Sequence, residues 1–326
     1  GVPNAKTGAT AHSRLGLFSG LQTNGRPAML FPGPTRHSER VLETKRITTL
    51  ALVVLVSFAA ACICTDSGAL RRVDDWCQDV YHVIAGKRHD ATHSVIASLD
   101  DATLAVHPDT PLVFWGPIYA KALTRLRAAG ARAVALDIHL GITPTQWLQT
   151  LGIASLAAVD LLDYDQDFDL SLSEGNVVLA ANLVRVGAEI KVRLPAAEYM
   201  NALSGGAAST GLTTLNRDPD NRVRKFVLDY ELLDALPAPR RWPTFAAAAV
   251  LEALGEEAAT PWHDLARERP MPISFCGPPG TIPRVSLSSV LREGGLTPQE
   301  EALVKGRIVF VGVEFEGASD RLPTPY

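Results

Sequence analysis

The stretch that decides how this chain is organised is Ile47-Thr-Thr-Leu-Ala-Leu-Val-Val-Leu-Val-Ser-Phe-Ala-Ala-Ala-Cys-Ile-Cys-Thr65, nineteen residues without a charge, a glycine or a proline. As an α-helix this run is about 28 Å long, close to the thickness of the hydrocarbon core of a bilayer. No later segment approaches this length. We therefore expect one transmembrane helix at 47–65, a tail at 1–46 on one side of the membrane, and a large domain at 66–326 on the other.

The charges on either side of the apolar run predict its orientation. Residues 1–65 contain 7 Lys and Arg against 2 Asp and Glu, whereas the rest of the chain contains 24 against 33. Basic residues favour the cytoplasmic side of a membrane. We therefore expect the tail in the cytoplasm and the domain exported to the other side of the membrane. Because the domain is acidic, nucleic acid is not an expected partner.

A cleaved signal peptide is the alternative interpretation of the apolar run, since Ala59-Ala-Ala61 precedes Cys62. The run is longer than an ordinary signal core, and a tail of forty-six residues comes before it. We therefore expect the helix to be retained. Of the four cysteines, Cys77 and Cys276 fall in the domain, where either a disulfide or two free thiols would fit.

The tail at 1–46 is rich in Gly, Pro, Thr, Ser and Asn and has no apolar periodicity, so it lacks the means to order on its own. A segment of this kind orders on a partner. The expected partners are other integral membrane proteins, which would contact the tail and the transmembrane helix. The residues that we expect to make these contacts are Leu17, Phe18, Leu30, Phe31, Leu52 and Leu55.

In the domain, short apolar runs alternate with segments of helical periodicity. This alternation predicts an α/β fold, a mixed sheet flanked by helices, with parallel strands at 94–99 and 131–136 joined through a helix. The other strands are expected at 176–181, 189–194, 211–215, 222–229, 271–275 and 307–313. The helices are expected at 70–84, 118–129, 144–162, 244–254 and 285–291.

Eight motifs follow one another through the domain in a fixed order. They are Val95-Ile-Ala-Ser-Leu-Asp-Asp101, Trp115-Gly-Pro117, Ala128-Ala-Gly-Ala-Arg-Ala-Val-Ala-Leu-Asp137, Gly175-Asn-Val-Val-Leu179, Asp218-Pro-Asp-Asn-Arg-Val-Arg224, Phe275-Cys-Gly-Pro-Pro-Gly280, Lys305-Gly-Arg-Ile-Val-Phe-Val-Gly312 and Asp320-Arg-Leu-Pro-Thr-Pro325. From about Leu70 to Tyr326, this order resembles the second class of CHASE domains, the cyclase/histidine-kinase-associated sensory extracellular modules of bacteria.

The resemblance implies an extracytoplasmic α/β input domain behind one N-terminal membrane helix. Together with the orientation expected above, it implies a bacterial inner (cytoplasmic) membrane with the domain in the periplasm. Two motifs depart from the family pattern. The Pro-Trp-Pro-Arg of the family is here Trp115-Gly-Pro-Ile118, and its Asp-Gly turn is here Asp220-Asn221. Asn tolerates positive φ, so the second motif still predicts a tight turn.

Three carboxylates, Asp100, Asp101 and Asp137, follow the strands expected at 94–99 and 131–136. If these strands are adjacent, the carboxylates converge at the edge of the sheet where open α/β folds bind ligands. There they could hold a cation or a basic ligand, or act as acid and base. Asp is also common as a helix cap directly after a strand, and we favour that structural role.

The segment Asp163–Glu174 places oxygen-bearing side chains, among them Asp163, Asp165, Asp167 and Glu174, at the spacing of a calcium loop. Phe168 occupies the position that needs glycine for the sharp turn. We therefore expect a solvated acidic loop and no metal site.

No sequence motif pairs a nucleophile with a base or forms a cofactor-binding fingerprint, so we expect a non-enzymatic protein without cofactors. The family usually continues into further membrane helices and a cyclase or kinase, which are absent from this sequence. We therefore expect an accessory or docking subunit of a multi-protein membrane assembly, such as one for electron transport or light harvesting. The alternative is the extracytoplasmic sensory domain of a cyclase or kinase receptor whose output domain lies beyond Tyr326.

Overall fold

The computed structural model describes residues 36–66, 68, 70–153, 163–187, 189–232, 240–255, 270–317 and 322–326. The chain divides into two units, 1–71 and 72–326, which are treated separately below. The predicted partner contacts at Leu17, Phe18, Leu30 and Phe31 lie outside the described residues.

The N-terminal unit contains one long helix, α1 (Arg36–Asp66). Its segment Thr44–Thr65 is long and apolar enough to cross a membrane. Leu52 and Leu55 lie within this segment and are 59% and 64% exposed, and their contact with a partner stays a prediction. The prediction that the tail is unstructured up to residue 46 is wrong for 36–46, which are helical. No glycine or proline interrupts the chain between Thr35 and Ser67, so the helix starts well before the apolar run.

The domain is built on a mixed sheet with the strand order β10-β1-β11-β2-β3-β4, in which β5 also pairs with β3. All of these pairs are parallel except β3 with β4. The strands are β1 (Ser94–Leu99), β2 (Ala133–Leu136), β3 (Val177–Val186), β4 (Glu189–Arg193), β5 (Thr210–Leu212), β10 (Arg284–Ser286) and β11 (Ile308–Val313). The predicted fold class is confirmed, but β1 and β2 are not adjacent, because β11 lies between them.

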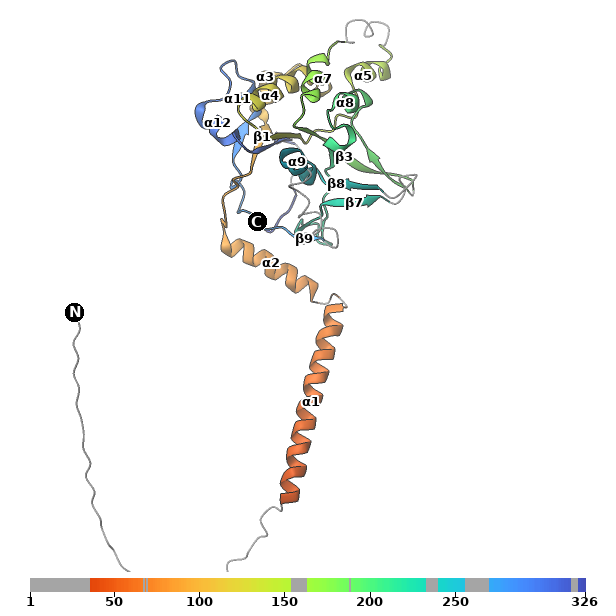
Figure 1. Cartoon of the computed structure of the whole chain (residues 1–326), viewed down its shortest axis with the longest axis vertical. Coiled ribbons are helices and arrows are strands. Elements are labelled where there is room, and N and C mark those ends of the chain that lie inside the picture. Colours follow the sequence, from red (N-terminus) through yellow and green to blue (C-terminus); the bar gives the residue numbers. More distant parts are fainter. Residues whose placement is uncertain are drawn as a thin grey trace, which may run out of the picture. The chain divides into compact units, whose positions relative to one another are not determined.

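Helices cover both faces of this sheet (Figure 1). Alternate residues of each strand face opposite sides, and the two sides belong to different apolar clusters. One cluster joins Val95, Val134 and Val309 to the larger group of helices, and the other joins Ala135 and Val178 to a single helix, α9 (Phe245–Leu254). The larger group includes α3 (Asp101–Val106), α4 (Gly116–Ala128), α7 (Gln166–Ser173), α8 (Ala197–Ala202), α11 (Leu287–Leu291) and α12 (Pro298–Val304).

The remaining elements are short. Two small sheets pair β6 (Lys225–Phe226) with β9 (Met271–Pro272), and β7 (Asp229–Leu232) with β8 (Arg240–Pro243). Single turns of 3₁₀ helix lie at Leu112–Phe114 and Gly206–Ser209. The strand expected at 222–229 is largely absent: residues 222–224 follow the turn without forming a strand, and the strands in this range are β6 and the first residue of β7. The helix expected from 144 is α5 (Pro144–Thr150), and the second half of that prediction lies partly outside the described residues.

The helix predicted at 70–84 is present as α2 (Arg71–Ala85), at the start of the domain unit. Its two buried side chains are polar, Asp79 and His82. Its large apolar side chains are exposed, with Trp76 at 63% and Ile84 at 80%. The polarity of α2 is therefore reversed relative to an ordinary surface helix, which buries its apolar face.

Candidate functional site

A tight turn at residues 218–224 carries the most strongly connected polar group of the domain. Asn221 has a φ of 65°, in the left-handed region that Asn tolerates better than most residues. The backbone N–H of Asn221 donates to the carbonyl of Asp218, and the N–H of Asp218 donates to the carbonyl of Arg222. The turn predicted at Asp220-Asn221 is thus confirmed, and it holds two acidic and two basic side chains within seven residues.

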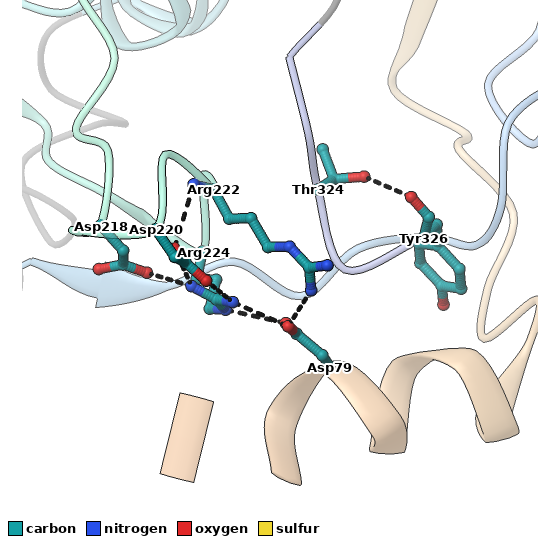
Figure 2. A network of polar contacts seen from close by, with 7 residues as sticks. All are labelled: Asp79, Asp218, Asp220, Arg222, Arg224, Thr324 and Tyr326. Carbon is teal, nitrogen blue, oxygen red and sulfur yellow. Dashed lines mark hydrogen bonds and ion pairs between the residues drawn. The ribbon is translucent and has the colours of Figure 1, made fainter. Parts of the chain in front are cut away.

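Arg224 lies at the centre of this group and is 1% exposed (Figure 2). Its Nε and Nη2 donate to the two carboxylate oxygens of Asp79 on α2, at 2.8 and 2.7 Å. Its Nη1 donates to Asp218 at 3.0 Å and to Asp220 at 2.9 Å, and Nη2 donates to Asp220 at 2.6 Å. These bonds use all five N–H groups of the guanidinium. A fully bonded buried Arg in this fork geometry fixes its partners in orientation as well as in distance.

Charged side chains from both segments make the contact between the 218–224 turn and α2. Arg222 also bonds to Asp79, so that carboxylate is shared between two guanidinium groups. Hydrogen bonding to Arg224 lowers the pKa of Asp79, and it lowers the pKa of Asp220 to about 2. The bonds from Asp79 and Asp220 raise the pKa of Arg224. All these groups are therefore ionised at neutral pH, and the network ties α2 to a turn about 145 residues further along the chain.

A second set of contacts joins α2 to the C-terminal segment. The buried ring of His82 lies 5.4 Å from the ring of Phe275 and 5.8 Å from that of Tyr326. Tyr326 donates its hydroxyl hydrogen to the carbonyl of Gly86 at 2.7 Å, directly after α2. Desolvation lowers the pKa of His82, so the imidazole is neutral at pH 7. Both the 218–224 turn and residue 326 thus contact one helix (Figure 2).

The three carboxylates predicted at the sheet edge are not brought together as one site. Asp100 caps α3, accepting from the backbone N–H of Thr103 at 2.9 Å and from the hydroxyl of Ser286 at 3.0 Å. Asp101 accepts from the backbone N–H of Glu316 at 3.2 Å. Asp137 is exposed after β2, and β11 separates it from the other two. The capping role matches Asp100, and the assumption that the two strands are adjacent was wrong.

The acidic segment 163–174 is helical over α7, not a loop. Phe168 and Leu172 are buried in the main core, so the apolar side chains of the segment decide its structure. Asp163 and Asp165 precede α7, Asp167 lies in its first turn and Glu174 follows its end, so the segment does not form the loop that a calcium site of this spacing needs. Among the described residues, no group of three or more His, Cys, Asp and Glu could hold a metal ion. Cys77 and Cys276 are not joined in a disulfide.

One part of α7 has unusual electrostatics. Asp165 and Asp169 each bury one carboxylate oxygen that has no hydrogen-bond partner, while the other oxygen of Asp165 accepts from Tyr199 at 2.6 Å. Desolvation raises the pKa of Asp165. Desolvation, Asp165 and Glu198 together raise the pKa of Asp169 to about 6. Among the described residues, the groups that shift these two pKa values include no cation.

Sequence reasoning found the 218–224 motif but assigned it no role. Alternating acidic and basic residues beside a tight turn were the available signal. Asp79, which bonds to Arg224, lies in α2, a helix that is predicted from the spacing of the apolar residues on its other face. No local pattern connects these two segments.

Comparison with known proteins gives one match. A family model described as the CHASE2 domain matches residues 49–326, which is most of the chain. No curated protein and no solved structure matches the sequence.

Proposed function

This chain belongs to the CHASE2 domain family, an extracellular sensory family, and from that membership we propose that it is the extracytoplasmic sensory input of a membrane receptor. The resemblance seen in its ordered motifs is thereby confirmed. The family favours the sensory alternative over an accessory or docking subunit, for which the comparisons give no support. A receptor role needs neither a catalytic centre nor a cofactor in this domain.

The observation that carries the proposal is the Arg224 network. A sensory domain must pass a change in its fold to the segment that leads to the membrane, and α2 begins five residues after α1 ends. The network fixes α2 to the 218–224 turn through five hydrogen bonds of one buried side chain. Tyr326 fixes the last residues to the other end of the same helix. A rearrangement of the domain would therefore move α2 and the C-terminal segment together.

The proposal includes a location. The basic residues before the apolar helix and the acidic character of the domain support a bacterial inner membrane with the tail in the cytoplasm and the domain in the periplasm. Single cysteines at positions 20 and 101, in a chain whose four native cysteines are replaced by serine, test this topology. An impermeant thiol reagent applied to intact spheroplasts should label position 101 and spare position 20. The reverse pattern would contradict the orientation.

The sensory role can be tested in a chimera. Residues 70–326 would replace the CHASE2 domain of a receptor cyclase, and cyclic nucleotide production would be measured in membranes. We expect the input domain to change the rate of cyclic nucleotide production relative to the cyclase without an input domain. Arg224→Met should shift this rate to one fixed level. Arg241→Met is the matched control, because within the described part of the chain the ion pair of Arg241 is with Asp229 on the neighbouring strand and not with a residue of α2. If both variants and the parent chimera show the same rate as the cyclase without any input domain, the sensory proposal is wrong.

A further inference from the structure

The exposed face of α2 is apolar over most of its length. Seven side chains of this face, which we call the outer face of α2, are Val73, Trp76, Cys77, Val80, Tyr81, Val83 and Ile84. All are exposed except Val80, which is half-buried, and Trp76, Val83 and Ile84 are each more than 60% exposed. The opposite face holds the buried Asp79 and His82. A helix with this much exposed apolar surface needs a partner.

The width of the outer face indicates what that partner is. With 3.6 residues per turn, the seven side chains cover an arc of about 160° around the helix axis. A helix that pairs with one other helix uses a narrower apolar seam of two positions per heptad. A wide apolar arc opposite a charged one is typical of helices that lie in the plane of a membrane surface. Trp76 and Tyr81 are the aromatic types that are enriched at the membrane–water interface.

The position of α2 in the chain agrees with this partner. Only four residues separate the end of α1 at Asp66 from the start of α2 at Arg71, so the two ends are at most about 19 Å apart. If α1 crosses the bilayer, the first turn of α2 is confined to the region of the headgroups. Basic residues lie at both ends of α2, Arg71 and Arg72 in its first turn and Lys87 and Arg88 just after it, where they can reach lipid phosphates.

We propose that α2 lies in the membrane interface, with its outer face in the lipid and with Asp79 bonded to Arg224 on the side away from the lipid. The reversed polarity of the helix is then explained, since each face has a partner of its own kind. The domain rests on the membrane surface through α2 and is not held away from it on an extended linker. This inference concerns the membrane contact alone and does not depend on the sensory role.

The test uses the intact chain in nanodiscs of phosphatidylcholine and phosphatidylglycerol, at one chain per disc. Cys77 is already on the outer face, so replacing the other three cysteines with serine leaves one site for a nitroxide label. Collisions of the label with oxygen, which concentrates in lipid, and with a water-soluble nickel chelate report its surroundings. The matched site is Arg71→Cys in a cysteine-free chain, because Arg71 is exposed on the polar side of the same helix.

We expect the ratio of oxygen to nickel collisions to be several-fold higher at position 77 than at position 71. Ile84→Glu should lower the ratio at position 77, whereas the adjacent Ala85→Glu, off the outer face, should leave it unchanged. Equal nickel access at both positions would overturn the proposal. Exclusion of both reagents at position 77 would also overturn it. So would spin–spin broadening at position 77 in discs that hold two chains, if nickel reaches the same position in discs that hold one chain. These results would show instead that protein, or a second copy of the chain, covers the outer face.

Discussion

Two clusters of aspartate side chains in this domain have opposite electrostatic environments. Around Arg224, the carboxylates of Asp79, Asp218 and Asp220 bond to a guanidinium that is 1% exposed. In the α7 cluster, Asp165 and Asp169 are partly buried without a cation. The first environment lowers the pKa of Asp79 and Asp220, and the second raises the pKa of both of its acids.

The comparison shows that burial alone does not decide how a carboxylate affects stability. Near Arg224, ionised acids stabilise the fold at neutral pH because the folded state holds their counter-charge in place. On α7, ionised acids destabilise the fold at the same pH because burial removes water and supplies no cation. The domain is therefore firmly held at α2 and under electrostatic repulsion at α7. The following experiments change one cluster at a time.

The largest effect is expected from Arg224→Met. Removing one partner of a buried ion pair leaves uncompensated charge, so the free energy of unfolding should fall by about 3–5 kcal/mol. Chemical denaturation of the intact chain in detergent measures this loss. The control Arg241→Met breaks a pair whose Arg is 44% exposed and should cost much less, because solvent screens an exposed ion pair. Equal losses in the two variants would mean that the Arg224 network adds nothing to the stability of the domain.

The opposite sign is expected from Asp169→Asn. A carboxyl whose folded pKa is about 6, above its value near 4 in the unfolded chain, makes the wild type less stable as the pH rises from about 4 to 6. The substitution should therefore stabilise the domain by about 1–2 kcal/mol at pH 8 and by almost nothing at pH 4. Thermal unfolding at both pH values measures the difference. Asp167→Asn, an exposed site on the same helix, should change neither value.

The carboxylate of Asp100 differs from those of both clusters, because its hydrogen bonds come from neutral donors. Asp100→Asn keeps an oxygen that can accept from the N–H of Thr103 and should cost less than about 0.5 kcal/mol, whereas Asp100→Leu removes the cap and should cost about 1 kcal/mol. Denaturation midpoints of the two variants make the comparison. Equal losses would indicate that the charge itself is needed, and would support the ligand site first considered for Asp100, Asp101 and Asp137.

The smallest effect is expected from Asp220→Asn. Its carboxyl is half exposed, so the loss at neutral pH should stay below about 1 kcal/mol. Its pKa of about 2 lies below its value in the unfolded chain, so its contribution is present above pH 4 and disappears as the pH falls towards 2. Stability measured between pH 5 and 2 should fall less steeply in the variant. An unchanged slope would mean that other carboxylates dominate the acid response.

The sequence predicted elements whose signal is local. The apolar helix, α2, β1 and β11 are each defined by a continuous periodic or apolar run, and all four are present. The placement of β11 between β1 and β2 could not be predicted, because a parallel pairing between segments about 210 residues apart leaves no local trace. The acidic residues of segment 163–174 predict a loop, whereas the buried side chains of Phe168 and Leu172 belong to a helix, α7.

The candidate site likewise has features that a local sequence signal predicts and features that it does not. The turn at Asn221 followed from local backbone preference, and so did the capping role of Asp100. The bond between Asp79 and Arg224 depends on the assembled fold, as does the raised pKa of Asp169. Charge environments are sums over neighbours in space, and a sequence gives only neighbours along the chain.

The central position of β11 affects how the chain must be made. A ribosome completes β1 some two hundred residues before it reaches Ile308, and the partner on the other edge of β1, β10, is made only shortly before β11. The nascent domain therefore carries unpaired strand edges through most of its synthesis, the condition under which aggregation competes with folding. The sheet can therefore be completed only after β10 and β11 have been made.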